Sequence, residues 1–170
     1  MDVLWAPWRM EFLRAPRVPG CVLCGLVAAE AEGTDRERLV LWRGRSVYCV
    51  MNLYPYNAGH VMLVPNQHVA DLATLSREAQ GELIWLVGET VRIHREVLQS
   101  EGANCGMNIE KAGGAGFPDH LHFHVVPRWQ GDTNFFPVLA QSKSMPECLD
   151  QTYAQLQPAF AALSPHGAGC

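Results

Sequence analysis

The amino-terminal part of the chain lacks an uninterrupted apolar stretch. Its longest apolar run is broken by Arg9, Glu11 and Arg14, which argues against both a secretory signal and a membrane-spanning helix. The sequence also contains no internal repeat and no low-complexity tract. We therefore expect a soluble cytoplasmic protein.

An excess of positive charge is also missing. The 170 residues include 13 Lys and Arg against 17 Asp and Glu, a formal net charge of −4. No global basic field exists to recruit nucleic acid polymers or an anionic membrane, so any phosphate group must be bound locally. The length suits a single domain, or one core with an arm.

Cysteine is present, but we expect it to be reduced. Without a signal peptide, the six cysteines should remain thiols. Cys21 and Cys24 are separated by two residues, a spacing that favours half of a metal site over a disulfide. The competing interpretation is that both are small apolar side chains at the start of a helix.

Hydrophobic periodicity indicates an α+β protein. One long amphipathic helix follows Asp71 or Ser76, either of which can cap it, and its core-facing positions recur at three- and four-residue steps: Leu83, Leu86, Val87, Val91, His94 and Leu98. We expect strands over 39–42, 47–52, 60–65, 104–110 and 120–127, a short helix over 22–31, and a helix over 146–163 interrupted at Pro158. This order predicts an antiparallel sheet backed by a helix.

Three parts of the chain differ in composition. Residues 1–20 contain three prolines, two tryptophans and three arginines, which is typical of an irregular arm packed on a surface. Trp5 and Trp8 can fill the contact of this arm with its own core or lie in a subunit interface. Residues 21–135 hold the motifs described below, and residues 136–170 are expected to be a carboxy-terminal extension.

Three histidines form the most informative pattern. His120, His122 and His124 alternate with apolar residues, and because side chains of a strand alternate between faces, the three imidazoles share one face. Chance is a poor explanation for three of seven histidines within five residues. A metal triad is the stronger competitor to catalysis, since imidazoles on one strand can converge on zinc or copper.

A glycine-rich segment, residues 111–116, precedes these histidines. Backbone N–H groups in such a turn can hold an anion. The segment can equally be an ordinary loop that needs glycine for positive φ angles.

Together these features resemble the histidine-triad (HIT) superfamily. The stretch HLHFHVV, residues 120–126, is similar to the HIT signature, and the glycine turn and the strand that begins at Gly59 and His60 accompany it. The resemblance runs from about Cys21 to Trp129. The segments LWAPWRMEF, NLYPYNAGHVMLVP and HVVPRWQGDTNFFP are most similar to bacterial diadenosine tetraphosphate phosphorylases. The resemblance implies a five-stranded antiparallel sheet with a long helix, paired as a homodimer.

The resemblance also implies a mechanism. His122 would attack the α-phosphorus of a dinucleoside polyphosphate and form a transient nucleotidyl-histidine, since neutral imidazole is nucleophilic near pH 7. His124 and His60 would contact phosphate oxygens. The second acceptor is inorganic phosphate, giving ATP and ADP, or water, and the phosphorylase resemblance favours phosphate.

Nucleotide and phosphate contacts are expected at Asn52, Leu53, Asn108, Gly114, Gly116, Arg128 and Trp129. Asn52 falls where the family holds the ribose hydroxyls, and Asn108 falls near the residue that contacts the phosphate chain. Either asparagine can instead be an ordinary hydrogen bonder of a turn or an edge strand. Arg128 and Trp129 can contact the substrate or pack on the surface, and Trp129 can also lie against a neighbouring subunit.

The chain departs from the family at one position. Many members have Ser, Thr or Gln three or four residues before the first triad histidine, where this chain has Gly116 and Phe117. Assistance to the leaving group must then come from backbone amides, Lys111 or a bound phosphate. A phosphate acceptor also needs a second anion pocket, for which Lys111, Arg128 and Lys143 are candidates.

A second constellation resembles the structural zinc site of some bacterial HIT proteins. Cys21, Cys24, His68 and His120 would supply two thiolates and two imidazoles, which satisfy tetrahedral zinc. His60 is a rival fourth ligand, but its place after a glycine turn fits phosphate better. We expect zinc and no organic cofactor.

Two other functions remain open. The same histidines can hydrolyse nucleoside phosphoramidates, or they can belong to a non-catalytic module that binds nucleotide or zinc without turnover. His94, on a helix face, and His166, near the end of the chain, are assigned structural or solvated positions.

Overall fold

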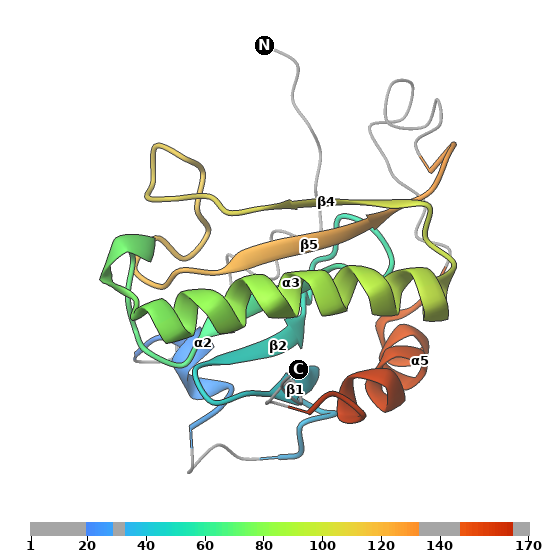
Figure 1. The fold of residues 1–170 in the computed structure, drawn as a ribbon, viewed down its shortest axis with the longest axis horizontal. Coiled ribbons are helices and arrows are strands. Elements are labelled where there is room, and N and C mark those ends of the chain that lie inside the picture. The colour runs from blue at the N-terminus through green and yellow to red at the C-terminus, as the bar shows by residue number, and fades with distance from the viewer. Residues whose placement is uncertain (1–19, 29–32, 133–146, 165–170) are drawn as a thin grey trace.

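The computed structural model describes residues 20–28, 33–132 and 147–164. Five strands form one antiparallel sheet in the order β1-β2-β3-β5-β4 (Figure 1). They are β1 (Val40–Arg43), β2 (Val47–Met51), β3 (Val61–Pro65), β4 (Gly102–Gly106) and β5 (Phe123–Arg128). The predicted α+β fold with a five-stranded antiparallel sheet is confirmed. Residues 1–19 of the expected arm lie outside the described residues, so its packing and the proposed domain boundaries stay predictions.

Helix α3 (Arg77–Leu98) is the long helix expected from the periodicity. The Ser76 hydroxyl accepts a hydrogen bond from the N–H of Ala79 at 3.1 Å and so caps the first turn. Asp71 caps a different element, the short 3-10 helix η1 (Leu72–Thr74), by accepting from the N–H of Ala73. Both residues proposed as caps therefore cap a helix, but not the same one.

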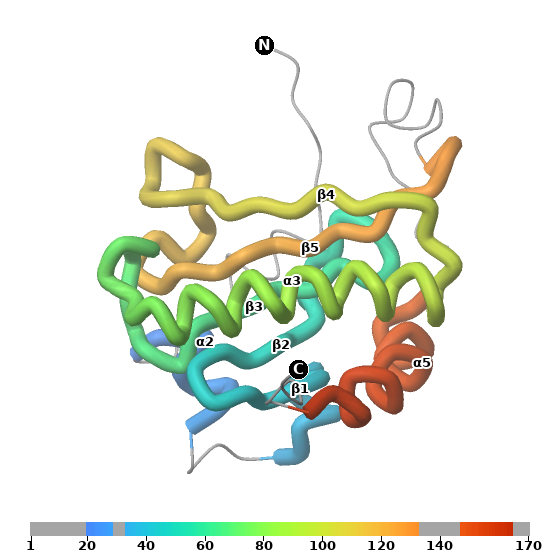
Figure 2. Tube along the Cα trace, viewed as in Figure 1, coloured from blue at the N-terminus to red at the C-terminus, as the bar shows by residue number. Residues whose placement is uncertain are grey.

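Helices lie on both faces of the sheet. Helix α3 and helix α5 (Leu149–Ala161) cover one face (Figures 1 and 2), where alternate residues of the strands, such as Cys49 and Val125, join their core. Helix α2 (Val22–Gly25) packs its Leu23 against the intervening residues of β2 and β3. These lie on the opposite face because side chains alternate along a strand.

Two strands begin or end elsewhere than expected. The strand predicted over 104–110 is β4, which ends at Gly106 because that residue, opposite His124, makes the last pair with β5. The strand predicted over 120–127 begins pairing at Phe123, opposite Leu63. Side-chain alternation nevertheless extends through the unpaired residues before β5, since Leu121 packs against residues of the α3 side.

Two helices also differ from the expectation. The helix predicted over 22–31 ends at Gly25, a residue with low helix propensity, and residues 29–32 lie outside the described part. Helix α5 is not interrupted at Pro158 but continues to Ala161. Its Leu156 and Phe160 are fully buried in the main core, and this packing offsets the backbone hydrogen bond that proline cannot make.

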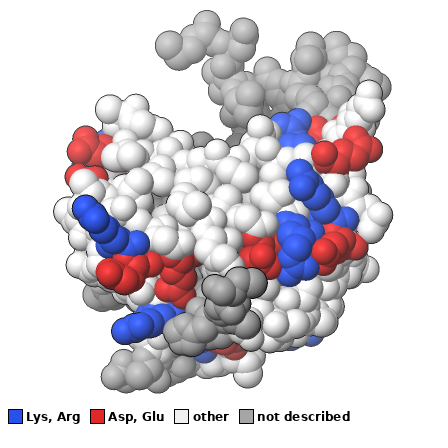
Figure 3. All heavy atoms as spheres, viewed as in Figure 1, with Lys and Arg blue, Asp and Glu red and all other residues white. Residues whose placement is uncertain are grey.

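The surface over α3 carries charges of both signs. Figure 3 shows basic and acidic side chains interleaved on this face, in agreement with the slightly negative net charge of the whole chain. None of the helices in the described part is long and apolar enough to cross a membrane.

Candidate active site and metal site

His60 and His124 are joined by a hydrogen bond whose direction follows from a backbone contact. Fully buried His60 accepts the N–H of Tyr56 at its Nδ1, at 3.0 Å, so its own proton lies on Nε2. That Nε2 is 2.9 Å from Nδ1 of His124, which must act as the acceptor. The proton of His124 is therefore on Nε2, the atom left to donate to a ligand.

The loop between β2 and β3 holds His60 in place. Asn52 accepts the N–H of Tyr54 at its Oδ1, at 2.9 Å, and points its Nδ2 at Nδ1 of His60, at 3.4 Å. The exposed ring of Tyr56 stacks on His60 with 4.6 Å between the ring centres. Gly59 has φ near +80°, and a Cβ atom there would approach Leu98 to 2.5 Å, so this turn requires glycine.

His122, the expected nucleophile, has one ring nitrogen fixed by a backbone contact. Its side chain is buried, and its Nδ1 donates a hydrogen bond of 2.9 Å to the backbone carbonyl of His120. Nε2 therefore carries a lone pair, and the described residues make no hydrogen bond to it. The His122 ring lies 4.9 Å from that of His124 and 6.1 Å from that of Phe117. The expected nucleophile His122 therefore lies next to His124.

Burial keeps the two supporting imidazoles neutral. It lowers the pKa of His60 to about 3, with further lowering by His124, His94 and His122. Burial also lowers the pKa of His124 to about 4, again with a contribution from His122. Near pH 7 both side chains are therefore hydrogen-bond donors through Nε2–H rather than cations.

Four expected metal ligands converge on the sheet face that carries α2. The ligand atoms of Cys21, Cys24, His68 and His120 all lie within 4.8 Å of one another. His120 donates its Nε2 hydrogen to the carbonyl of Pro65 at 2.9 Å, so its Nδ1 lone pair faces Cys21 Sγ at 3.2 Å.

The chemistry of this set fits a soft divalent cation. Burial, and then the neighbouring Cys21, raise the pKa of the Cys24 thiol, a penalty that a bound metal would reverse. The Nδ1 atoms of His68 and His120 are 3.3 Å apart, and the second of these is unprotonated. Two thiols and two imidazoles, one already oriented by a backbone carbonyl, match the donors that zinc prefers.

Four further residues expected to contact the nucleotide lie in the segments that precede β3 and β5. Leu53 is 57% exposed beside Asn52, and Asn108 is half-buried two residues after Gly106, the partner of His124. Gly114 and Gly116 are exposed in the loop before His120. Lys143 lies outside the described residues.

The structure does not bring Arg128 and Trp129 to the histidine cluster. Arg128 is four residues from His124 along β5, about 13 Å at the usual rise of a strand. Its guanidinium is engaged by Asp132, at 2.6 and 2.7 Å, and by Asn104. Trp129 donates its indole N–H to the carbonyl of Leu98. The phosphate contact expected of Arg128 stays a prediction, and in this structure its guanidinium is already paired with Asp132.

Sequence reasoning missed Asp132 as a support of the site. Its side chain is 8% exposed and accepts hydrogen bonds from Arg128, from the N–H of Trp129 and from the amide of Asn57, the last at 2.9 Å. The Asn57 carbonyl accepts the N–H of His60 at 3.1 Å. Asn57 and Asp132 are 75 residues apart, and no periodicity or motif spacing links them.

Known proteins share this architecture. The family model described as HIT domain matches residues 34–131, which include all five strands. An AP-4-A phosphorylase of Mycobacterium tuberculosis is 37% identical over 163 residues, covering 93% of this chain and 84% of the relative. An adenosine 5′-monophosphoramidase of Schizosaccharomyces pombe is 27% identical over 112 residues, covering 64% of this chain and 74% of the relative.

A solved structure agrees in fold. The crystal structure of a zinc-bound histidine triad family protein from Mycobacterium smegmatis superposes with a TM-score of 0.67 at 24% identity, covering 83% of this chain and 93% of the other. The family model thus matches every strand of the sheet that carries the histidines, and the phosphorylase relative matches nearly the whole chain. The protein belongs to the HIT domain family.

Proposed function

We propose that the protein is a phosphorylase that cleaves diadenosine tetraphosphate through a nucleotidyl-histidine on His122. The observation that carries this proposal is the hydrogen bond from His122 Nδ1 to the His120 carbonyl, which leaves a lone pair on Nε2. His124 stands beside it with an Nε2–H donor. The substrate class is supported by the phosphorylase relative, which matches this chain over 93% of its length.

The reaction has two displacements at the same phosphorus. His122 Nε2 attacks the α-phosphorus, the bond to the bridging oxygen breaks, and ATP leaves. An oxygen of inorganic phosphate then attacks the adenylyl-histidine and forms ADP, which restores the imidazole. The His120 carbonyl stabilises the positive charge that develops on His122, and the His124 N–H donates to a phosphate oxygen.

The leaving group is expected to be assisted by groups other than a polar side chain just before the first triad histidine. The ring of Phe117 lies edge-on to that of His122, at one of the two positions where the family resemblance implies a polar side chain. Backbone amides of the loop before His120, exposed Lys111 or the bound phosphate itself would hold the negative charge of the departing nucleotide. Because Arg128 is paired with Asp132, we favour exposed Lys111 for the acceptor phosphate, and Lys143, which lies outside the described residues, stays a second candidate.

We also assign a structural zinc ion to Cys21, Cys24, His68 and His120. Their convergent donors support it, as does the zinc-bound structural neighbour. When bound, zinc supplies a cross-link between α2 and the segment before β5, and no reaction step needs it.

A homodimer is supported by the outer edge of β4, where no other strand of the described part pairs. The sheet ends at this strand, and Asn104 and Cys105 are exposed along it. A second copy that pairs there would satisfy the backbone groups of the edge. Light scattering of the purified protein should then give twice the mass of the chain.

Product analysis tests the function. Diadenosine tetraphosphate is incubated with and without inorganic phosphate, alongside a His122→Ala variant. ADP and ATP formed only with phosphate support the proposal, whereas AMP and ATP formed in both tubes make the enzyme a hydrolase. No product that depends on His122, together with turnover of an adenosine phosphoramidate, favours the activity named for the Schizosaccharomyces pombe relative.

A further inference from the structure

The two cysteines of the proposed zinc site lie on a segment that has little regular secondary structure of its own. We call residues 21–27 the cysteine knuckle. Its only regular element, α2, has four residues, and Cys21 at its amino end makes no side-chain capping bond. Helices this short are unstable alone, so the positions of the two thiols depend on contacts from outside the knuckle.

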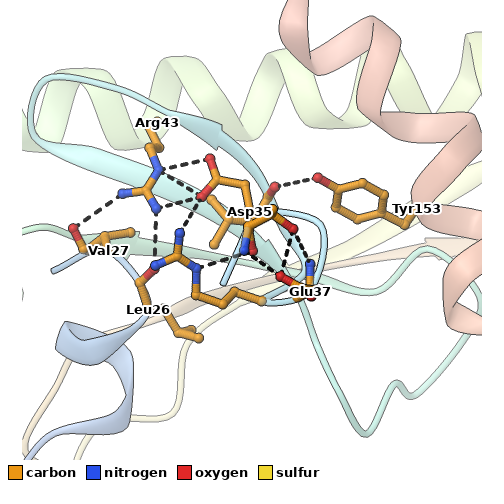
Figure 4. A network of polar contacts seen from close by, with 9 residues as sticks. Leu26, Val27, Asp35, Glu37, Arg43 and Tyr153 are labelled. Atoms are coloured by element: carbon orange, nitrogen blue, oxygen red, sulfur yellow. Dashed lines mark hydrogen bonds and ion pairs between the residues drawn. The ribbon is translucent and has the colours of Figure 1, made fainter. Parts of the chain in front are cut away.

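Two side chains of the sheet supply those contacts. Arg43, the last residue of β1, donates through Nη1 to the carbonyl of Val27 and through Nη2 to that of Leu26, each at 3.3 Å (Figure 4). Tyr48 of β2 donates its buried hydroxyl to the carbonyl of Leu23 at 2.7 Å. Three carbonyls of the knuckle are thereby tied to two neighbouring strands.

Asp35 fixes the orientation of Arg43. Its carboxylate accepts from Nε at 3.0 Å and from Nη2 at 2.6 Å (Figure 4), and Arg38 adds a bond of 3.1 Å to the same carboxylate. The planar guanidinium thus reaches Asp35 and the knuckle together, a geometry that a lysine ammonium cannot reproduce.

We propose that Arg43, oriented by Asp35, is a positioning residue of the metal site. It holds the cysteine knuckle so that Cys21 and Cys24 face His68 before the metal arrives. Such preorganisation lowers the entropy lost on binding and slows release of the ion. The proposal rests on the zinc site assigned above, but it makes a separate claim about residues that never touch the metal.

The experiment measures metal affinity in the full chain. Cobalt(II) is the spectroscopic probe, read through its thiolate absorption, and zinc affinity is measured by competition with a chromogenic chelator. Arg43→Gln removes both the planar guanidinium and its charge, whereas Arg43→Lys removes the planar guanidinium but keeps a positive charge. Arg92→Gln is the matched control, because Arg92 makes comparable bonds to Glu89 and Glu96 on α3.

Both Arg43 variants should bind cobalt and zinc about 10-fold more weakly than the wild type, while Arg92→Gln should match the wild type. If Arg43→Lys keeps wild-type affinity, charge alone explains the contact and the proposal is overturned. Unchanged affinity in both Arg43 variants overturns it as well. A wild-type chain that binds no metal would instead sink the zinc site itself.

Asp35→Asn keeps the proposal testable if the Arg43 variants do not fold. It leaves the arginine in place but weakens its orientation, so metal affinity should fall in the same direction by a smaller factor. Melting temperatures of the metal-free proteins distinguish lost positioning from general unfolding. Wild-type affinity in a folded Asp35→Asn protein would contradict the role given to this pair.

Discussion

His122 donates its Nδ1 hydrogen to the backbone carbonyl of His120 across 2.9 Å. His120 points its own Nδ1 toward the sulfur atoms of Cys21 and Cys24, at 3.2 and 3.4 Å. The proposed nucleophile is therefore oriented by a proposed zinc ligand two residues before it. One peptide carbonyl couples the two sites.

Loss of zinc should reach the active site through this carbonyl. In Cys24→Ser the metal should bind at least about 10-fold more weakly, and turnover should fall because the His120 backbone is less firmly held. Cys148→Ser is the control, since Cys148 is exposed at the start of α5. Zinc content and kcat are measured on the same samples. A zinc-free variant with wild-type kcat would show that the two sites are independent.

His60 and His124 should act as one unit. His60→Ala removes the donor that fixes the tautomer of His124, so kcat should fall about 100-fold, as it should in His124→Ala. The double variant should be hardly slower than either single variant. Steady-state kinetics of the three variants provide the test, and losses that multiply would contradict the proposed hydrogen-bonded pair.

Asp132 should matter for stability far more than a surface carboxylate. Asp132→Asn weakens the bonds that join Arg128 to Asn57, and we expect the free energy of unfolding to fall by about 1–3 kcal/mol. The control is Asp150→Asn, whose carboxylate is 75% exposed and pairs with Arg36, with an expected change below about 1 kcal/mol. Urea denaturation measures both, and equal losses would refute the supporting role of Asp132.

His94 should make the fold sensitive to acid. It is fully buried on α3 behind Gly59, and burial lowers its pKa to about 4. The unfolded chain takes up a proton near pH 6.5 and the folded chain only near pH 4, so stability is present above pH 6.5 and is lost as the pH falls. Between pH 7 and 5 the loss from this histidine is about 2 kcal/mol.

The His94→Leu variant isolates this contribution. Its free energy of unfolding should fall by about 2 kcal/mol less than that of the wild type between pH 7 and 5. The other histidines largely cancel in the difference, although the variant also loses one cause of the lowered pKa of His60, the neighbouring His94. Parallel pH profiles of wild type and variant would mean that His94 is not held neutral in the folded state.

The sequence predicted the features that depend on neighbouring residues: side-chain alternation along strands, helix periodicity and the helix N-cap. Alternation placed the triad histidines opposite Leu121 and its apolar neighbours, and this holds even before β5 begins to pair. The three- and four-residue periodicity located α3, and Ser76 caps it because an N-cap depends only on nearby residues. The four ligands of the metal site were predicted from the family resemblance, and the structure brings them together.

Long-range pairing explains the errors. The end of β4 is set by its last partner, His124, which no feature of residues 104–110 reveals. The ion pair of Arg128 with Asp132 was not predicted, because no motif or spacing marks Asp132 as its partner. Helix α5 runs through Pro158 because core packing outweighs a local penalty. Each error lies where tertiary contacts override local preference.

Trapping of the intermediate tests the central claim most directly. Protein mixed with diadenosine tetraphosphate without phosphate is quenched at alkaline pH, where a phosphoramidate survives, and its peptides are analysed by mass spectrometry. We expect one adenylyl group on His122, lost when phosphate is added and absent in His122→Ala. Turnover without any such adduct, or an adduct on His124 instead, would contradict the role assigned to His122.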